Sequence, residues 1–268
     1  MSLITLSSDF GLEDPYVGIM KGVILGINPE VHLVDLTHSL SHHRLLEAAF
    51  VLHSAFSYFP KETIHLVVVD PGVGGDRRLI GIKGKEQYWI GPDNGLFSLV
   101  LKDQPEALVV HLAKTAFFLP VISATFHGRD KMAPVAAHLS LGVPLMEMGP
   151  RVLDPVVLPF PEPEITRGGI CGQVLWSDHF GNLITNIHQS EILPWLSGEA
   201  PTIRIGSHCI TRIHRHYSQG RAGEWMALFS SSGYLEIAFY LGKAAEKMNY
   251  TPGMDLTVSV TKDPGVLS

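Results

Sequence analysis

The chain of 268 residues is poor in cysteine, and it lacks both long apolar runs and an excess of basic residues. Its two cysteines, Cys171 and Cys209, are too few for a disulfide framework and form no CxxC pair, which favours a reducing, cytoplasmic setting. No apolar run is long enough to cross a bilayer, and the first residues lack the basic and apolar regions of a signal peptide. A formal charge of -6 provides no basic surface for nucleic acid. Neither a membrane nor a nucleic acid is therefore expected as a partner.

Histidine is abundant, with 14 residues. No HExxH motif or similarly spaced set occurs among them, so the sequence predicts no metal site. A hydrophobic content of 46% with 17% charged residues is ordinary for a globular protein. At this length the chain is expected to form one large domain or two modest ones.

The first half of the sequence alternates between strand and helix patterns. This alternation predicts an α/β domain over residues 1–160, with a mainly parallel sheet in a three-layer arrangement. The expected strands are Leu3–Ser7, Val31–Leu36 and His65–Val69, followed by a hairpin pair, Leu79–Ile82 and Tyr88–Ile90. The expected helices are Tyr16–Ile27, Leu45–Phe59 and Lys131–Leu141, and a further element opens over Leu96–Leu101.

The second half follows a proline-rich stretch, Pro155–Glu164, which is typical of a linker. Short apolar segments separated by turn residues then predict a smaller all-β barrel or sandwich over residues 165–268. Its expected strands are Gly169–Trp176, Thr202–Ile205, Met226–Phe229, Tyr234–Ala238 and Leu256–Val260.

The stretch His65–Arg78, HLVVVDPGVGGDRR, is the strongest candidate for a site. A strand that is apolar on both faces ends on Asp70, Pro71 stops the ladder, and a glycine-rich turn leads to Arg77. Ligands of open α/β sheets bind beyond the carboxyl ends of the strands. An acid and a guanidinium at such a place suggest a binding site. A surface turn with an Asp–Arg salt bridge explains the same pattern.

Two further acids, Asp9 and Asp35, also lie at or near the ends of expected parallel strands, so they should converge with Asp70 on one edge of the sheet. Asp9 could accept hydrogen bonds from a diol, or it could simply cap a turn. His127, in the polar run Thr125–Asp130, could order or deprotonate water, or bond to backbone in a loop. Its neighbours Arg129 and Asp130 are expected to pair with each other.

The second half has three candidate binding groups. Asn182 follows a strand in a polar turn and offers the donor and acceptor that a purine edge requires, although asparagine is also common in β-turns. Tyr217 could stack on a base, or be an exposed loop residue. The serine-rich turn that contains Ser231 could hold a carboxylate, or be a flexible loop.

Five segments in order carry a resemblance to a known family: Ser8–Ile24 (SDFGLEDPYVGIMKGVI), Val68–Arg78 (VVDPGVGGDRR), Gly91–Leu96 (GPDNGL), Thr125–Asp130 (TFHGRD) and Asp178–Ile187 (DHFGNLITNI). They closely resemble the S-adenosyl-L-methionine hydroxide adenosyltransferases, the hydrolytic relatives of the fluorinating and chlorinating enzymes. The resemblance runs from Ile4 to about Val260. It implies an N-terminal α/β domain, a C-terminal β-barrel, and a homotrimer that holds substrate between neighbouring subunits.

The resemblance also implies roles for individual residues. The family's catalytic trio corresponds to Asp70, Arg77 and His127. Its substrate-binding residues correspond to Asp9 for the ribose diol, Asn182 and Tyr217 for adenine, and Asp14, Asp178 and Ser231 for the methionine end. The family usually carries Pro–aromatic–Asp where this chain has His42-His43-Arg44, and its halogenating members place an arginine where this chain has Ser232.

The expected reaction is hydrolysis of S-adenosyl-L-methionine to adenosine and L-methionine, without a metal or redox cofactor. Two alternatives belong to other classes. One is halide transfer, but halogenating relatives have tyrosine at the position of Asp70 and serine at that of Gly128, and a carboxylate would repel halide. The other is a non-catalytic binder of adenosine or S-adenosyl-L-methionine, which would have no need of the trio.

Overall fold

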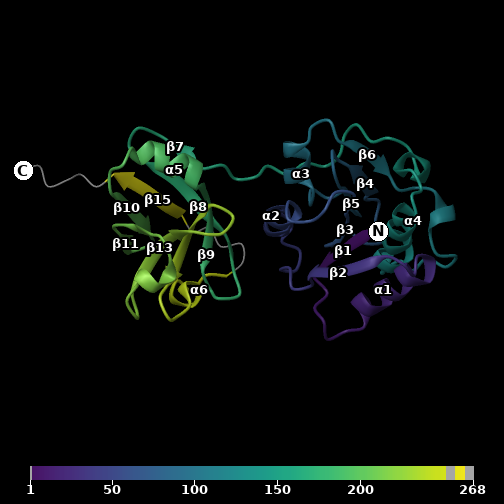
Figure 1. Cartoon of the computed structure of the whole chain (residues 1–268), viewed down its shortest axis with the longest axis horizontal. Helices are drawn as coiled ribbons and strands as arrows, with labels where there is room; N and C mark the ends of the chain where they lie inside the picture. Colours follow the sequence, from purple (N-terminus) through teal and green to yellow (C-terminus); the bar gives the residue numbers. More distant parts are fainter. Residues whose placement is uncertain (1, 252–256, 263–268) are drawn as a thin grey trace, which may run out of the picture. The chain divides into compact units, whose positions relative to one another are not determined.

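Two units make up the chain, and their boundary lies within the proline-rich stretch. The computed structural model describes residues 2–251 and 257–262, and divides the chain into residues 1–160 and 161–268 (Figure 1). Each unit has hydrophobic clusters of its own. No helix within the described ranges is both long and apolar enough to cross a membrane.

The first unit is built on a six-stranded mixed sheet in the order β2-β1-β3-β5-β4-β6. The strands β2, β1, β3 and β5 pair in parallel, whereas β4 is antiparallel to both of its neighbours. A short connection joins β4 to β5, and a parallel pair would need a long crossover. The strands are β1 (Leu3–Ser8), β2 (His32–Thr37), β3 (Ile64–Val68), β4 (Leu79–Lys83), β5 (Tyr88–Pro92) and β6 (Leu108–His111).

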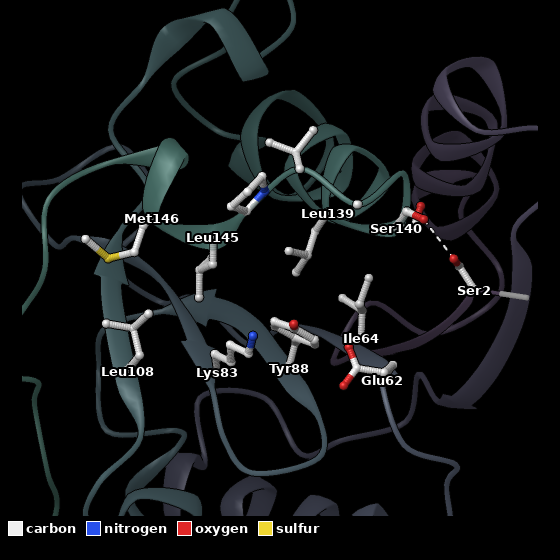
Figure 2. A pocket seen from close by; sticks show the side chains of 13 residues that line it. Ser2, Glu62, Ile64, Lys83, Tyr88, Leu108, Leu139, Ser140, Leu145 and Met146 are labelled. Atoms are coloured by element: carbon white, nitrogen blue, oxygen red, sulfur yellow. Dashed lines mark hydrogen bonds between the residues drawn. The ribbon is translucent and has the colours of Figure 1, made fainter.

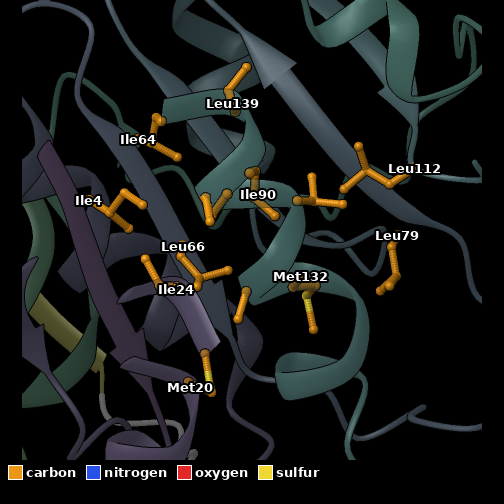
Figure 3. Close-up of a cluster of buried hydrophobic side chains, with 14 of the residues drawn as sticks. Ile4, Met20, Ile24, Ile64, Leu66, Leu79, Ile90, Leu112, Met132 and Leu139 are labelled. Atoms are coloured by element: carbon orange, nitrogen blue, oxygen red, sulfur yellow. The ribbon is translucent and has the colours of Figure 1, made fainter. Parts of the chain in front are cut away.

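Helices pack on both faces of this sheet, as alternate residues of β3 show. Leu66 and Val68 belong to a cluster with helices α1 (Tyr16–Ile27) and α4 (Ala133–Ser140). Val67, between them, belongs to a cluster with α2 (Leu45–Phe56) and α3 (Ser98–Asp103). Figure 3 shows side chains of the first cluster, including Met20 and Ile24 of α1. Burying each such aliphatic side chain contributes about 1.5–3 kcal/mol.

Helix boundaries account for most differences from the sequence-based expectations. The helix expected over Leu45–Phe59 ends three residues earlier, at Phe56. The helix expected over Lys131–Leu141 is instead a π-helix, η2 (Gly128–Met132), followed by α4. The element expected from Leu96 is the short helix α3, and strand β6 was not expected. Short 3-10 helices, η1 (Thr115–Phe117) and η3 (Leu145–Met148), flank the α4 region.

The second unit contains a curved, barrel-like sheet of nine strands. Its order is β11-β10-β15-β8-β9-β14-β13-β12, with β7 beside β8, and β11 also contacts β13. The strands are β7 (Glu164–Ile165), β8 (Ile170–Ser177), β9 (Leu183–His188), β10 (Pro201–Ile205), β11 (His208–Ile210), β12 (Ile213–His214), β13 (Trp225–Phe229), β14 (Tyr234–Phe239) and β15 (Thr257–Lys262). Of the last expected strand, Leu256–Val260, residue Leu256 lies outside the described residues.

Three helices and four strands of this unit, β7, β9, β11 and β12, were not expected from the sequence. Strand β9 is followed directly by α5 (Gln189–Leu196), which a capping box opens between His188 and Glu191. The two smaller elements are α6 (Ala244–Lys247) and the 3-10 helix η4 (Tyr217–Gln219).

Candidate active site

Two of the three strand-end acids meet at one edge of the first sheet. Ser8 of β1 and Val68 of β3 are in register, so the residues that follow these parallel strands leave the sheet side by side. Asp9 and Asp70 line the same cavity, whose volume is about 180 Å³. This placement follows from parallel pairing, because neighbouring strands present their carboxyl ends to the same edge.

Asp35, the third acid, lies inside β2 and does not line that cavity. The expectation that it would converge with Asp9 and Asp70 is wrong, because β2 continues to Thr37. Its Oδ1 lies 3.1 Å from Nε2 of His38, whose Nδ1 lies 2.8 Å from Oγ of Ser8. His38 and Ser8 are both buried. Asp35 thus stabilises, through His38, the end of the strand that carries Asp9.

Asp70, Arg77 and His127 form one hydrogen-bonded group at the cavity. Nε of Arg77 donates to Oδ1 of Asp70 at 2.9 Å, and its Nη2 donates to Oδ2 of the same carboxylate. The same Nη2 donates to Nδ1 of His127 at 2.9 Å. The side chains of Arg77 and Asp70 are only 12% and 5% exposed, so water screens the pair poorly.

The tautomer of His127 follows from these contacts. A guanidinium has no acceptor, so Nδ1 of His127 must accept the hydrogen bond and the proton of the neutral ring lies on Nε2. Burial lowers the pKa of His127, and the positive charges of Lys131 and Arg77 lower it further. The neutral ring is therefore favoured, with Nε2–H as a donor.

The glycine-rich turn positions Arg77 against the segment that carries His127. Gly74 has φ of +82°, and a Cβ there would lie 2.5 Å from the backbone oxygen of Ala124. Only glycine allows this approach. The turn brings Arg77 back onto Asp70, whereas the adjacent Arg78 pairs with Asp93 and Asp154 and takes no part in the group.

The π-helix η2 follows His127 directly. Arg129 and Asp130 pair with each other, with Nε of Arg129 donating to Oδ1 of Asp130 at 2.6 Å; the sequence-based expectation for this pair is confirmed. Lys131 is a cation that the sequence analysis did not single out. It lies four residues after His127, and its charge lowers the pKa of that histidine. The ammonium also lies 5.7 Å from the ring centroid of Phe118. Single-turn π-helices often mark functional sites, and this one places a second cation near the group.

The remaining cavity wall includes the segment where this chain departs from the family pattern. His43 lines the cavity with φ of 61°, and Nδ1 of the exposed His42 lies 3.7 Å from Oδ2 of Asp9. Asp14 is exposed and does not line the cavity in this unit. The structure thus brings Asp9 together with the trio, and leaves Asp14 outside that cavity.

A second group of predicted residues lies in the C-terminal unit. The side chain of Asn182 donates to Oδ2 of Asp178 at 3.1 Å and to the hydroxyl of Tyr217 at 3.3 Å. Asp178 also accepts from the backbone N–H of Asn182 at 2.8 Å. Tyr217 is 44% exposed, so a ligand can reach it. Ser231 is exposed in the turn between β13 and β14, whereas its neighbours Ser230 and Ser232 bond to each other.

Glu236 is a buried acid behind this second group that the sequence analysis missed. The Tyr217 hydroxyl donates to Oε1 of Glu236, which is only 3% exposed in strand β14. Burial raises the pKa of both side chains. Because Tyr217 donates to Glu236, it can only accept from Asn182. Both N–H groups of the Asn182 amide are thereby occupied, and its carbonyl oxygen is the group left for a ligand. The sequence signal was a lone carboxylate in the apolar strand YLEIAF.

No metal ligand set is apparent in the part of the chain that the structure describes, where no three His, Cys, Asp or Glu side chains are grouped suitably.

Comparison with known proteins identifies the family. A model described as the SAM hydroxide adenosyltransferase N-terminal domain matches residues 4–149, and one for the C-terminal domain matches residues 172–257. The chain belongs to the SAM hydroxide adenosyltransferase family. The resemblance found in the sequence motifs is confirmed.

Curated relatives of the chain carry two different names. A protein of Thermus thermophilus, named (R)-S-adenosyl-L-methionine hydrolase, is 38% identical over 92% of this chain and 95% of its own length. One of the same name from Methanocaldococcus jannaschii is 32% identical over 93% and 92%. A fluorinase of Actinoplanes is more distant, at 27% identity over 97% of each chain. A crystal structure of an uncharacterized conserved protein from Thermotoga maritima matches with a TM-score of 0.90 and 35% identity, covering 97% of this chain and all of that one.

Proposed function

We propose that this protein hydrolyses (R)-S-adenosyl-L-methionine to adenosine and L-methionine. The observation that carries the proposal is the Asp70–Arg77–His127 group, buried beside Asp9 at the carboxyl edge of a sheet. The identity of the substrate is taken from the relatives, because four of them at 32–38% identity are named (R)-S-adenosyl-L-methionine hydrolase. Their name specifies the (R) epimer, which distinguishes the configuration at sulfur.

The reaction needs a positioned nucleophile and little else. A water oxygen forms a bond to C5′ of the ribose, the C5′–S bond breaks, and its electron pair returns to sulfur. The sulfonium leaves as neutral methionine, so no general acid is required. One proton must leave the water. Holding that water in line with the C5′–S bond is the main contribution expected of the protein.

The hydrogen-bond directions divide this work among three residues. Nε2–H of His127 donates to the water or hydroxide oxygen, and the Arg77 charge favours hydroxide. Asp70 is the group with free acceptor capacity, so we assign it the proton. The hydrogen bond from Arg77 to Nδ1 of His127 supports this choice of Asp70 over His127.

Substrate binding is divided between the two groups of side chains. Asp9 accepts from the ribose diol, and Tyr217 stacks on adenine. The free carbonyl oxygen of Asn182 accepts from the 6-amino group, which is a donor in adenine. Asp14, Asp178 and Ser231 are proposed to contact the methionine end. The positive sulfonium suits a site that contains several carboxylates.

Halide transfer is the weaker candidate. Asp70 is an anion where the nucleophile would stand, and it would repel halide. A Cβ on Gly128 would lie 3.2 Å from Cγ1 of Val68, so the serine of halogenating relatives would crowd this site. A non-catalytic binder would have no use for a buried Asp–Arg–His group, which costs desolvation to maintain.

The proposal extends to assembly and architecture. We infer a homotrimer with substrate between neighbouring subunits, a cytoplasmic location, and no metal or redox cofactor. We also infer that the first unit is a three-layer α/β domain and the second a β-barrel. The family resemblance supports these inferences, and light scattering of the full chain tests the trimer.

Asp70→Asn and His127→Ala test the catalytic assignment. Each should keep adenosine affinity and lower turnover by about 10²–10⁴-fold, since neither residue is assigned to the base or ribose. Because both residues act on one water, turnover by the double variant should be little lower than that of the less active single variant. Full turnover by both single variants would exclude this mechanism.

A further inference from the structure

A second and larger cavity lies at the opposite edge of the first sheet. Its volume is about 420 Å³, within the range of small-molecule sites. It is lined at the amino ends of β3, β5 and β6 and by Lys83, the last residue of antiparallel β4. Asp70 and His127 lie beyond the carboxyl ends of the strands and do not line it. This cavity is therefore separate from the candidate active site.

The floor of the cavity is a row of side chains across four strands. Lys83 pairs with Leu108 on one side and with Tyr88 on the other, and Tyr88 pairs with Ile64. Directly paired residues point to the same face of a sheet, so the row reads aliphatic, cationic, phenolic, aliphatic. Figure 2 shows Leu108, Lys83 and Tyr88 in this order along one wall.

The opposite wall is apolar and comes from the end of α4, the loop that follows it and the start of η3. Leu139 and Leu145 face the row across the cavity (Figure 2). Leu145 packs closely on the sheet, because a Cβ on Gly81 would lie 2.5 Å from its Cδ1. At the other end, Oγ of Ser2 donates to the backbone oxygen of Ser140 at 2.7 Å and ties strand to helix. The cavity is thus bounded by fixed elements.

Two opposite charges border this apolar space. Nζ of Lys83 lies 5.4 Å from the ring centroid of Tyr88, and Glu62 lines the cavity on the far side of Tyr88 (Figure 2). Neither charge forms an ion pair with any residue in the described part of the chain. Glu62 also has φ of 62°, a backbone conformation that glutamate adopts less readily than glycine or asparagine. A carboxylate is therefore held here despite a backbone cost.

We propose that this cavity binds a free apolar α-amino acid. The ligand carboxylate pairs with Lys83, its ammonium pairs with Glu62, and both lie over Tyr88. Its side chain packs between Ile64 and the leucines of the opposite wall. A zwitterion satisfies both charges at once, which neither a simple acid nor a simple amine can do. L-Methionine, the product of the proposed reaction, belongs to this class, but the binding site does not depend on that reaction.

Calorimetry on the full chain with L-leucine tests the proposal, because leucine is not a product of the proposed reaction. We expect saturable binding with Kd on the order of 1 mM or tighter. Lys83→Met and Glu62→Gln should each weaken it at least about tenfold. Lys85→Met is the matched control, since Lys85 does not line the cavity, and it should bind as the unaltered protein does. The single-charge analogues 4-methylpentanoate and 3-methylbutylamine should bind at least about tenfold more weakly.

The variant Glu62→Gly distinguishes loss of the binding site from misfolding of the protein. Glycine suits positive φ, so this variant should melt at a higher temperature while losing leucine affinity. Hydrolysis of S-adenosyl-L-methionine should be unchanged in Lys83→Met, which separates this site from the proposed activity. The absence of leucine binding, equal affinity in Lys83→Met, or loss of binding in Asp70→Asn would each overturn the proposal.

Discussion

Replacing Arg77 with methionine should destabilise the first unit severely. Arg77 makes hydrogen bonds to both oxygens of a carboxylate that is only 5% exposed, and its own side chain is 12% exposed. Removing one partner of a buried ion pair leaves an uncompensated charge, at a cost of about 3–5 kcal/mol. That is a large share of the roughly 5–15 kcal/mol that stabilises a typical protein. Nδ1 of His127 loses its donor as well.

The double variant Arg77→Met/Asp70→Leu separates charge burial from packing. With both charges replaced by apolar groups, most of the lost stability should return, because the desolvation cost disappears with the pair. Both variants should lack hydrolase activity.

Native-state hydrogen exchange of β3 amides in urea is the appropriate assay, since it reports on the unit that carries the pair. A loss below about 1 kcal/mol in Arg77→Met, as in an exposed ion pair, would refute the rigid, buried group on which the mechanism depends. So would a double variant no more stable than the single one.

Three other perturbations test separate parts of the account. Asp9→Ala should weaken adenosine by roughly 1.5–3 kcal/mol per lost hydrogen bond, and unchanged affinity in calorimetry would remove Asp9 from the site. Glu236→Gln frees the Tyr217 hydroxyl to reorient, so Asn182 can turn its amide; preference for adenosine over inosine should fall about tenfold or more, and an unchanged preference would contradict the hydrogen-bond directions. Burial lowers the pKa of His65 from 6.5 to about 4. As the pH falls through this range, the unfolded chain takes up a proton that the folded chain does not. The free energy of unfolding should therefore fall by about 3 kcal/mol as the pH is lowered from 6.5 to 4. In urea titrations His65→Gln should lose less stability over that range, and a loss equal to that of the unaltered protein would disprove the assignment to His65.

The strand-end argument located part of the site from sequence. It placed Asp9 and Asp70 at one edge, because β1 and β3 are adjacent and parallel. It failed for Asp35, since strand ends cannot be fixed to the residue and β2 runs past it. His127 was joined to Asp70 and Arg77 by the family resemblance, because the 50 residues between Arg77 and His127 give no local signal of contact.

Features that depend on tertiary contacts could not be predicted. Glu236 sits in an apolar strand pattern, and its partner Tyr217 is 19 residues earlier, in the 3-10 helix η4. Lys131 appeared to open an ordinary helix, whereas the π-helix places it one turn after His127. The second cavity depends on the antiparallel placement of β4, which brings Lys83 beside Tyr88 and Leu108.

Incubation of the purified protein with (R)-S-adenosyl-L-methionine in water enriched in oxygen-18 tests the central claim most directly. Attack of water on C5′ should place the label on the 5′-hydroxyl of adenosine and leave methionine unlabelled, with the same result whether or not chloride is present. The (S) epimer should react far more slowly. Adenosine without label, a chlorinated nucleoside, or intact substrate after prolonged incubation would contradict hydrolysis by a positioned water.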